Sequence, residues 1–465
     1  LDLLVPKDTV LYFTCNRLDC KPVVTAAGEG FTKYQFSWKN IPKTTDSEGA
    51  TPENLDRFPW FMASSANDWS SVVKWYIQKT YRRTEPNYEV LQKTKTLIRP
   101  GMTEQQKVDA IYTFITKEVK YSFVPFLNSS YTPKRPSETV SGSIGDCKDV
   151  ATLMVSMLRE AGIPAWHTLV STHSFSEKEP RPTLYVFNHA IAAWESAADK
   201  SLHFLDLTTD YFPANVLPEM DNYGWGLVIR PGESLLRRLP NDLLNPEKTA
   251  IDLTAKAVVG RDRSISLETE TVMRGVVAGK FRETLNPKTA DERQKFLADY
   301  FGGGSLNNLS FEKIKFDSLE NLAAPLRSKM SLRAFNQVDK VSNFHIIPLP
   351  LPLTMPARRE LFAEKRYNNL DLNDLFELAP VHETVEVALP TGWQLADVPK
   401  DISRQSEFGD YSLKFEKMAN GTLRISRDLR FKQRFIPNED YGQFKAFYLE
   451  ISDFDGTKLA LKQAN

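Results

Sequence analysis

The sequence predicts an α+β protein with a core of helices packed on an antiparallel sheet, flanked by β-sandwich-like domains. Two observations predict this class. Helix-spaced apolar residues occur three times between residues 69 and 164, and short strand-like runs rich in β-branched and aromatic residues follow them and occur in both flanks. The length of 465 residues exceeds what one hydrophobic core usually serves, so several domains are expected.

Three helices are expected in the central part of the chain. The first begins near Trp69, and the second begins after Thr103, which stands in capping-box spacing with Gln106. A segment rich in Pro, Ser and Thr, residues 125–145, is expected to form a loop. This loop leads to the third helix, whose N-terminus is at Cys147.

The predicted sheet follows these helices in the sequence. Strand-like runs occupy residues 166–171, 184–194 and 201–207, and polar turns separate them. An antiparallel sheet that packs on the helices is therefore expected. Proline and polar residues between 237 and 249 predict a connection out of this core, with a boundary near residue 245.

The flanks are predicted to be rich in strands. Alternating residues at 265–273 indicate a strand, and one helix is expected at 292–301. The Pro-rich segment 348–356 favours an extended connector, and strands are expected at 385–389 and 447–451. The chain therefore divides into four predicted parts, which are an N-terminal β-domain (1–64), the core (65–245), a β-rich domain with one helix (246–355) and a C-terminal β-domain (356–465).

Charge and hydropathy narrow the classes of partner. Lys and Arg together number 59, as do Asp and Glu, and this balance disfavours nucleic acid or an anionic membrane as the main partner. No apolar run approaches the roughly 18 residues that span a bilayer. The chain opens at Leu1 rather than Met, which fits a cleaved secretory signal or a trimmed chain, and a periplasmic or extracellular location is expected.

The three cysteines are too few for a disulfide framework. Cys15 and Cys20 flank a short polar stretch, where a turn would bring their sulfur atoms opposite each other. A disulfide and a pair of small semi-buried thiols are both open, whereas a metal site is disfavoured because no histidine lies nearby. Cys147 stands far from both and is a separate case.

Cys147 lies where a cysteine becomes nucleophilic. The run Gly145-Asp146-Cys147-Lys148-Asp149 places it in the first turn of a helix, where unpaired backbone N–H groups and the macrodipole favour a thiolate. Asp146 and Asp149 suit the N-cap and the third helical position, but their negative charges oppose a thiolate. A nearby imidazolium is therefore required. The alternative interpretation is an inert core cysteine.

His189 and Asp206 are the candidates for the rest of this site. His189 lies in the strand-like run 187–191 and Asp206 in the next one. Pairing of these strands would let the carboxylate bond one imidazole nitrogen and leave the other facing Cys147. Taken singly, a strand histidine is usually structural, and Asp206 fits the start of a turn. Together, in this order on a helix N-terminus and adjacent strands, the residues predict a catalytic triad.

Three runs resemble the transglutaminase-like superfamily, which has a papain-like Cys-His-Asp core. They are Tyr131-Thr132-Pro133-Lys134-Arg135-Pro136-Ser137-Glu138, Gly145-Asp146-Cys147-Lys148-Asp149 and Phe187-Asn188-His189-Ala190. The resemblance extends roughly from Trp69 to Arg230 and is to bacterial proteins, many from Bacteroidetes, in which two β-domains of unknown function flank the core. It implies that Cys147 is the nucleophile, His189 the base and acid, and Asp206 the orienting carboxylate. The preceding domain is longer in those proteins, which implies that the N-terminal β-domain here is partial.

The expected function is cysteine-dependent acyl transfer or amide hydrolysis, through a thioester, on a protein or peptide such as a cell-wall peptide. The backbone N–H of Cys147 and a side chain from residues 121–131 are expected to hold the oxyanion. The alternative is a non-catalytic binding or scaffold protein with an occluded triad, whose β-domains recognise peptides or glycans.

No metal or cofactor is expected. The run Gly302–Gly304 follows a helix instead of joining a strand to one, so it is not a phosphate-binding loop. The other histidines lack metal-ligand spacing and are interpreted as structural or exposed. They are His167, His173, His203, His345 and His382.

Overall fold

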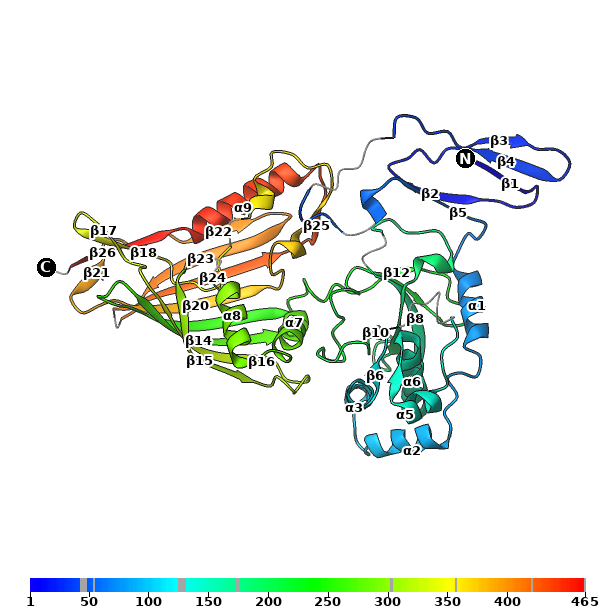
Figure 1. The fold of residues 1–465 in the computed structure, drawn as a ribbon, viewed down its shortest axis with the longest axis horizontal. Coiled ribbons are helices and arrows are strands. Elements are labelled where there is room, and N and C mark those ends of the chain that lie inside the picture. Colours follow the sequence, from blue (N-terminus) through cyan, green and yellow to red (C-terminus); the bar gives the residue numbers. More distant parts are fainter. Residues whose placement is uncertain are drawn as a thin grey trace. The chain divides into compact units, whose positions relative to one another are not determined.

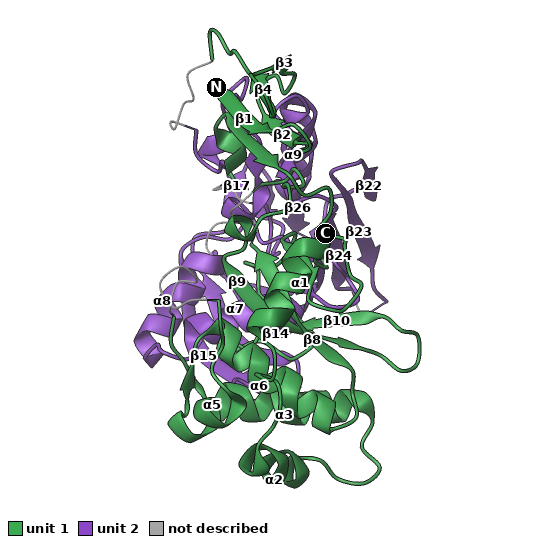
Figure 2. Ribbon diagram, turned by 90° about the vertical axis from the view of Figure 1, so that its right-hand side faces the viewer, with its two compact units in different colours: residues 1–46, 52–241 green, residues 47–51, 242–465 purple. Residues whose placement is uncertain are grey.

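The computed structural model divides the chain into two compact units. It describes residues 1–41, 48–52, 55–123, 131–172, 176–301, 304–355, 358–419 and 421–463. The first unit comprises residues 1–46 and 52–241, and the second unit comprises residues 47–51 and 242–465 (Figure 2). The division lies close to the boundary that the sequence predicts near residue 245.

Most of the helices described in the first unit begin at a side-chain cap. Its described part contains α1 (Ser70–Lys79), α2 (Tyr88–Leu97), α3 (Glu104–Glu118), α5 (Pro136–Gly142) and α6 (Cys147–Glu160). At the start of α3, the Thr103 hydroxyl accepts from the Gln106 backbone N–H, and the Gln106 side chain accepts from the Thr103 N–H. This is the predicted capping box. α1, α3 and α6 match the three expected helices, whereas α2 and α5 are absent from the prediction.

α5 corrects the expectation of a continuous loop at residues 125–145. Pro136 lies in its first turn, where the missing N–H of proline removes no helical hydrogen bond. The Glu138 carboxylate accepts from the backbone N–H of Arg135 at 3.0 Å and caps the helix. α5 packs on α6, and such packing stabilises a seven-residue helix that its composition alone does not predict. Residues 125–130 of the predicted loop lie outside the described residues.

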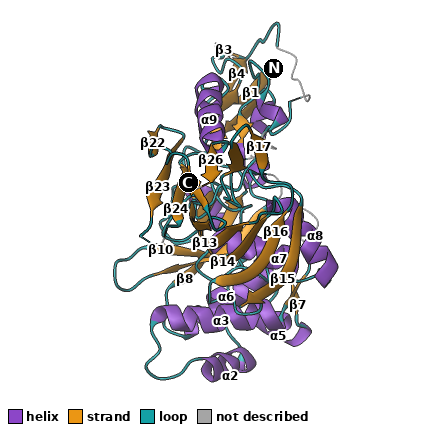
Figure 3. Ribbon diagram, turned by 90° about the vertical axis from the view of Figure 1, so that its left-hand side faces the viewer, coloured by secondary structure: helices purple, strands orange, loops and turns teal. Residues whose placement is uncertain are grey.

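The sheet of the first unit follows these helices, as predicted. Its strands pair antiparallel in the order β10-β9-β8-β11-β12. They are β8 (Ala165–Ser171), β9 (His189–Glu195), β10 (Leu202–Leu205), β11 (Trp225–Val228) and β12 (Arg237–Arg238). α6 packs on β8 and β9, and α3 lies beside α6 (Figures 1 and 3). Buried apolar residues of these elements, such as Ile111 and Leu153, form one core. The strand expected from residue 184 begins later, because residues 184–186 form a 3₁₀ turn.

The N-terminal residues form two small antiparallel sheets within the first unit. One has the order β1 (Asp2–Pro6), β4 (Phe31–Gln35) and β3 (Val23–Ala26), and the other pairs β2 (Tyr12–Asn16) with β5 (Trp60–Ser64). Phe36 packs edge-on against Phe13 and Phe61, with ring centroids 5.0 and 4.7 Å apart. Cys15 and Cys20 form a disulfide, which decides between the two arrangements that the sequence leaves open.

One eight-stranded sheet forms the framework of the second unit. Its order is β15 (Leu309–Asp317), β16 (Leu326–Ala334), β14 (Ile265–Arg274), β13 (Ala250–Val259), β20 (Val381–Ala388), β24 (Leu423–Phe431), β23 (Gly409–Lys417) and β22 (Ile402–Gln405). β13 and β20 run parallel, whereas the other neighbours run antiparallel. The predicted parts 246–355 and 356–465 therefore share a single sheet, so the division between them is corrected. The Pro-rich segment interrupts the strand pattern locally, and pairing between distant strands leaves no local signal.

The helices of the second unit pack on this sheet. Its described part contains α7 (Gly275–Leu285), α8 (Ala290–Phe301) and α9 (Tyr441–Asp455). α8 agrees with the helix expected at residues 292–301, but the strand predicted at 447–451 is wrong because these residues lie in α9. The buried residues of α9 recur every three or four positions, and they are Tyr441, Phe444, Phe447, Tyr448, Ile451 and Asp455. None of the helices described in the two units has the length and apolar character needed to cross a bilayer.

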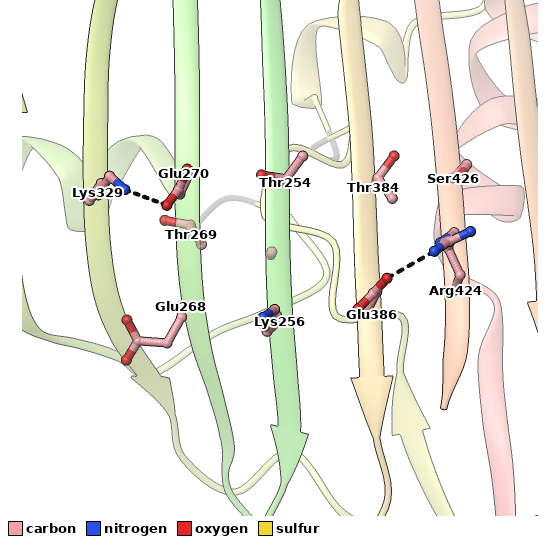
Figure 4. A pocket seen from close by; sticks show the side chains of 11 residues that line it. Thr254, Lys256, Glu268, Thr269, Glu270, Lys329, Thr384, Glu386, Arg424 and Ser426 are labelled. Atoms are coloured by element: carbon pink, nitrogen blue, oxygen red, sulfur yellow. Dashed lines mark hydrogen bonds and ion pairs between the residues drawn. The ribbon is translucent and has the colours of Figure 1, made fainter. Parts of the chain in front are cut away.

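One face of the eight-stranded sheet is polar, and the opposite face carries a buried network of ion pairs. Figure 4 shows Thr, Ser, Lys, Arg and Glu side chains along an open groove of about 850 Å³ on the polar face. One row across the strands alternates in charge, and it runs Glu268, Lys256, Glu386 and Arg424. Glu386 pairs with Arg424 at 3.0 Å. Neighbouring charges on this face therefore compensate one another.

The buried ion network ties α9 to the sheet. Arg427 on β24 donates from Nε and Nη2 to the two carboxylate oxygens of Asp455 at 2.7 and 2.8 Å, and from Nη1 to Glu383 at 3.1 Å. The Tyr411 hydroxyl also donates to Asp455, at 2.7 Å. Two backbone N–H groups donate to the same two carboxylates. Each charge of this buried network is therefore paired directly.

A short upstream segment completes the second unit. Residues 48–51 belong to this unit although they precede most of the first one. The Glu48 carboxylate accepts from the backbone N–H of Tyr367 at 2.8 Å. The buried Arg366 donates to the backbone carbonyl of Gly49, also at 2.8 Å. The second unit is thus built from two separate stretches of chain.

Candidate active site

Cys147 occupies the first turn of α6, as the sequence predicts. The Asp146 side chain accepts from the Asp149 backbone N–H, and the Asp149 carboxylate accepts from the Asp146 N–H, both at 3.2 Å. This capping box fixes the start of the helix. The ammonium group of Lys148 bonds Asp146, so a cation offsets negative charge at the cap. The backbone N–H of Cys147 stands at the helix N-terminus, where N–H groups have no partner within the helix.

Gly145 permits close packing just before the cysteine. A Cβ atom at this position would lie 2.9 Å from the Cβ of Asp149 and 3.1 Å from Cγ2 of Thr139, closer than ordinary contact. Gly145 ends β7 (Ile144–Gly145), which pairs in parallel with β6 (Lys120–Tyr121). This pairing brings Tyr121 beside Gly145 and hence close to the cysteine.

His189 and Asp206 come from adjacent strands. His189 is the first residue of β9, and Asp206 directly follows β10, which pairs antiparallel with β9. His189 Nε2 lies 3.1 Å from Asp206 Oδ2. The backbone N–H and the hydroxyl of Thr208 both donate to Asp206 Oδ1 at 2.8 Å, and the Tyr112 hydroxyl donates to the Asp206 backbone carbonyl at 2.8 Å. These bonds fix the carboxylate toward His189.

The electrostatics of the pair keep a proton on His189 and a negative charge on Asp206. Burial lowers the pKa of His189, but the charge and hydrogen bond of Asp206, together with a hydrogen bond to Cys147, raise this pKa well above its usual value. Burial raises the pKa of Asp206, but the charge and hydrogen bond of His189 lower it below the usual range. Because Nε2 bonds Asp206, Nδ1 is the nitrogen left for Cys147. The structure therefore brings the three predicted residues together.

The cluster is buried in the first unit. Cys147, His189 and Asp206 are 5%, 4% and 2% exposed. Apolar side chains surround the thiol, including Trp69 and Tyr76 at α1. A buried thiol fits the non-catalytic alternative, in which the triad is occluded, so this burial bears directly on function.

Asp221 is a fourth member of the cluster that sequence reasoning misses. It is fully buried, and its carboxylate, the Asp206 carboxylate and the His189 ring offer ligand atoms that all lie within 4.8 Å of one another. These three side chains, all in the described part of the chain, could contact a single metal ion. His189 Nε2, however, already bonds Asp206. Asp221 lies in the loop before β11, where no motif marks it. Only the three-dimensional arrangement reveals it.

Two tyrosines lie near the thiol. Burial, and after it negative charge at Cys147, raises the pKa of Tyr76 and of Tyr121, so both hydroxyls stay protonated. The Tyr76 hydroxyl has no hydrogen-bond partner among the residues that the structure describes. Tyr121 opens the segment 121–131, in which the sequence predicts the second oxyanion donor, and residues 124–130 of that segment lie outside the described residues.

The other described histidines are not part of this cluster. His167 is buried, its Nε2 lies 2.8 Å from Thr152 Oγ1, and burial lowers the pKa of His167 to about 3. His173 lies outside the described residues. The remaining three contact a carboxylate or a tryptophan ring, and they are His382, His203 and His345.

Two family models match separate parts of the chain. Residues 92–201, which contain Cys147 and His189, match the transglutaminase-like superfamily. The predicted resemblance is therefore confirmed. Residues 346–461 match DUF3858, a domain of unknown function with a solved structure. No curated protein matches the chain.

One solved structure shares the fold of this chain. A crystal structure of a "putative protease" from Parabacteroides distasonis has a TM-score of 0.60 at 14% sequence identity, covering 99% of this chain and 71% of that chain. This similarity confirms the predicted α+β class. The structure of a "putative cysteine protease" from Cytophaga hutchinsonii has a TM-score of 0.21 at 15% identity, covering 44% of this chain and 66% of that chain.

Proposed function

We propose that this chain, whose residues 92–201 belong to the transglutaminase-like superfamily, is a cysteine-dependent enzyme that transfers or hydrolyses an acyl group of a protein or peptide. One observation carries the proposal. Cys147 stands at the N-terminus of α6 and shares a hydrogen bond with His189, whose Nε2 lies 3.1 Å from Asp206. A nucleophile, a base and an orienting carboxylate in hydrogen-bond reach are the requirements for covalent acyl transfer.

In the first half of the reaction, Cys147 is the nucleophile. Its thiolate attacks the carbonyl carbon of an amide, and the electron pair of the C=O bond moves to the oxygen. The backbone N–H of Cys147 is positioned to help hold this oxyanion. The imidazolium of His189 then gives its proton to the departing amine as the C–N bond breaks, which leaves a thioester and a neutral imidazole. Asp206 orients the ring and stabilises its protonated form.

In the second half, another nucleophile resolves the thioester. Neutral His189 takes a proton from water or from a primary amine as that molecule attacks the thioester carbon, and Cys147 departs as a thiolate. Water yields a carboxylic acid, and an amine yields a new amide. The same side chains serve hydrolysis and transfer to an amine. We therefore propose acyl transfer from proteins or peptides, including cell-wall peptides.

The test is the pH dependence of iodoacetamide labelling at Cys147, which is the free cysteine of the chain. Labelling of the Cys147 peptide is quantified by mass spectrometry in the parent and in His189→Ala. A thiolate–imidazolium pair reacts rapidly near pH 6, well below the value of about 8.5 at which a free thiol is half ionised. We expect His189→Ala to lower the rate at pH 6 by about 100-fold.

His167→Ala is the matched control, because it also removes a buried histidine from the first unit. Its labelling rate is expected to stay within twofold of the parent. Labelling of unfolded protein verifies that the thiol is intact. Slow labelling of the folded parent, or a rate that His189→Ala leaves unchanged, contradicts the proposal. Incubating the parent with peptides, with and without a primary amine, then separates cleavage from amine incorporation by product mass.

The burial of Cys147 favours a second candidate function, a non-catalytic binding protein. In that case the polar groove of the second unit is the candidate surface for a peptide or glycan. The labelling experiment separates the two candidates. A binding protein gives slow labelling at every pH until it unfolds.

We also propose a location outside the cytoplasm, such as the periplasm or the cell exterior. The disulfide between Cys15 and Cys20 supports this proposal, since disulfides persist in oxidising compartments. Fractionation of cells that produce the protein, followed by thiol-specific labelling of Cys15 and Cys20, tests it. Reduced cysteines in a cytoplasmic fraction contradict it.

A further inference from the structure

Asp221 is held by a tight turn between β10 and β11. Its backbone N–H donates to the carbonyl of Pro218 at 3.1 Å, and its carbonyl accepts from the N–H of Gly224 at 2.9 Å. The side chain of the buried Asn222 also donates to the Pro218 carbonyl, at 2.9 Å. A Cβ at position 224 would lie 2.8 Å from the carbonyl oxygen of Ser171, so this approach requires glycine. The turn therefore fixes where Asp221 lies.

The carboxyl group of Asp221 is buried and accepts no hydrogen bond. The residue is 0% exposed, and neither side-chain oxygen accepts a hydrogen bond from a donor group that the structure describes. Asp206 and His189 are the ionisable groups that act on it. An ionised Asp221 would place a second, unsolvated anion beside Asp206, with one imidazolium to balance both. The charge of His189 favours an ionised Asp221, but burial and the charge of Asp206 oppose it more strongly.

A proton on Asp221 removes this conflict. The neutral acid carries an O–H donor, and the Asp206 carboxylate retains acceptor capacity besides its bonds to His189 and Thr208. Burial, and then the charge of Asp206, raise the pKa of Asp221 well above its usual value, whereas the pKa of Asp206 is lowered. The two neighbouring carboxyl groups therefore differ in protonation, as coupled carboxyl pairs do.

We infer that Asp221 is a positioning residue which, as a neutral acid, donates a hydrogen bond to Asp206 and holds that carboxylate toward His189. This inference rests on the proposed function, because it adds a fourth member to the chain Cys147, His189 and Asp206.

Two substitutions separate the hydrogen bond from the shape of the side chain. Asp221→Asn keeps a neutral donor of the same size, whereas Asp221→Leu keeps the branched shape, with larger methyl groups, and removes the donor. The first readout is the infrared difference spectrum between the parent and Asp221→Asn at pH 7, in the region of the protonated carboxyl group. The second is the pH profile of iodoacetamide labelling at Cys147.

In the difference spectrum we expect a protonated-carboxyl band of the parent that Asp221→Asn lacks, and the band of Glu383 cancels because both proteins contain it. The labelling rate of Asp221→Asn at pH 6 is expected within about threefold of the parent, and that of Asp221→Leu about tenfold lower, since one hydrogen bond to a charged group is lost. The matched controls are Asp210→Asn and Asp210→Leu, at an exposed aspartate in the same loop as Asp206. These controls are expected to change neither readout.

Failure of this inference is distinguishable from failure of the proposed function, because the infrared band does not depend on thiol reactivity. A parent without the band overturns the inference, even if labelling shows an activated thiol. A folded Asp221→Leu with the pH profile of the parent also overturns it. If Asp221→Leu does not fold, the infrared band decides. A band that Asp221→Asn loses supports the inference, and a parent without this band refutes it. Stoichiometric Zn²⁺ binding that Asp221→Asn abolishes overturns it too, because both carboxylates would then be ionised ligands.

Discussion

Each unit of the molecule buries a cluster of charged side chains, but the two clusters differ in how completely they are paired. In the second unit, Arg427 forms direct bonds with both Asp455 and Glu383. In the first unit, His189 and Asp206 bond each other, but the Asp221 carboxyl group accepts no hydrogen bond from a described residue. The first cluster also holds a thiol.

The difference is the one expected between a structural polar network and the reacting cluster that we propose. Removing a charge from water is costly, so a network that only stabilises the fold matches every donor with an acceptor, as the one around Arg427 does. A reacting cluster must keep a group that can gain or lose a proton and an atom that can form a bond. Cys147, His189 and Asp221 meet that description, and the following three predictions test the contrast.

The largest effect is expected from breaking the closed network. Arg427→Met leaves Asp455 and Glu383 buried without a cation, so the free energy of unfolding of the second unit should fall by about 3–5 kcal/mol. Urea unfolding measures this loss. In native buffer, labelling of Cys147 at pH 6 should stay within twofold of the parent, because the thiol depends on the other cluster. Unchanged stability, or loss of labelling at pH 6, would contradict this distinction between the two buried clusters.

An intermediate effect is expected from pH. Burial raises the pKa of Glu383 to about 7, although Arg427 lowers it. The folded state therefore holds a proton that the unfolded state releases above about pH 4.3, and the free energy of unfolding falls by about 2 kcal/mol from pH 5 to pH 7. This contribution is complete below the unfolded pKa and is lost as pH rises through the folded one. Urea unfolding of Glu383→Gln at pH 5 and pH 7 should no longer show this fall of about 2 kcal/mol in the free energy of unfolding. A fall that persists in Glu383→Gln would belong to other groups.

The smallest effect comes from a matched pair of hydroxyl deletions. Tyr112 bonds the backbone carbonyl of Asp206, and Tyr411 bonds the carboxylate of Asp455. Tyr112→Phe and Tyr411→Phe should each cost about 1–2 kcal/mol in unfolding free energy, since each leaves a buried acceptor with one bond fewer. Only Tyr112→Phe should also slow Cys147 labelling, by about threefold. Equal labelling rates in the two variants would mean that the position of Asp206 does not depend on Tyr112.

The members of the site that sequence predicts are those that carry a local signal. Cys147 follows a capping aspartate at the start of an amphipathic helix, and His189 and Asp206 lie in or beside strand-like runs. Asp221 has no such signal. Its place depends on a turn fixed by backbone hydrogen bonds and by the buried side chain of Asn222, and that arrangement exists only in the folded chain.

The presence or absence of a local signal also explains which parts of the fold are predicted from the sequence. Helices α1, α3 and α6 and strands β8, β9 and β10 of the first unit follow periodic patterns, so their order is predicted correctly. In the second unit, the parallel pairing of β13 with β20 joins segments more than a hundred residues apart and leaves no trace in either strand. α9 is misread at residues 447–451 because its clustered aromatic residues also suit a strand, and the helical spacing emerges only over the whole of 441–455.

Residues 48–51 make the two units interleaved along the chain. Gly49 and Arg366, which bond each other, are 317 positions apart, so during synthesis the early partner leaves the ribosome long before the late one. A single proteolytic cut after residue 241 therefore does not release a complete second unit, because the fragment lacks the acceptors for Arg366 at residues 49–51. Reconstituting that unit from pieces requires a peptide containing residues 48–51, and a circularly permuted chain would have to keep this peptide and the C-terminal half together.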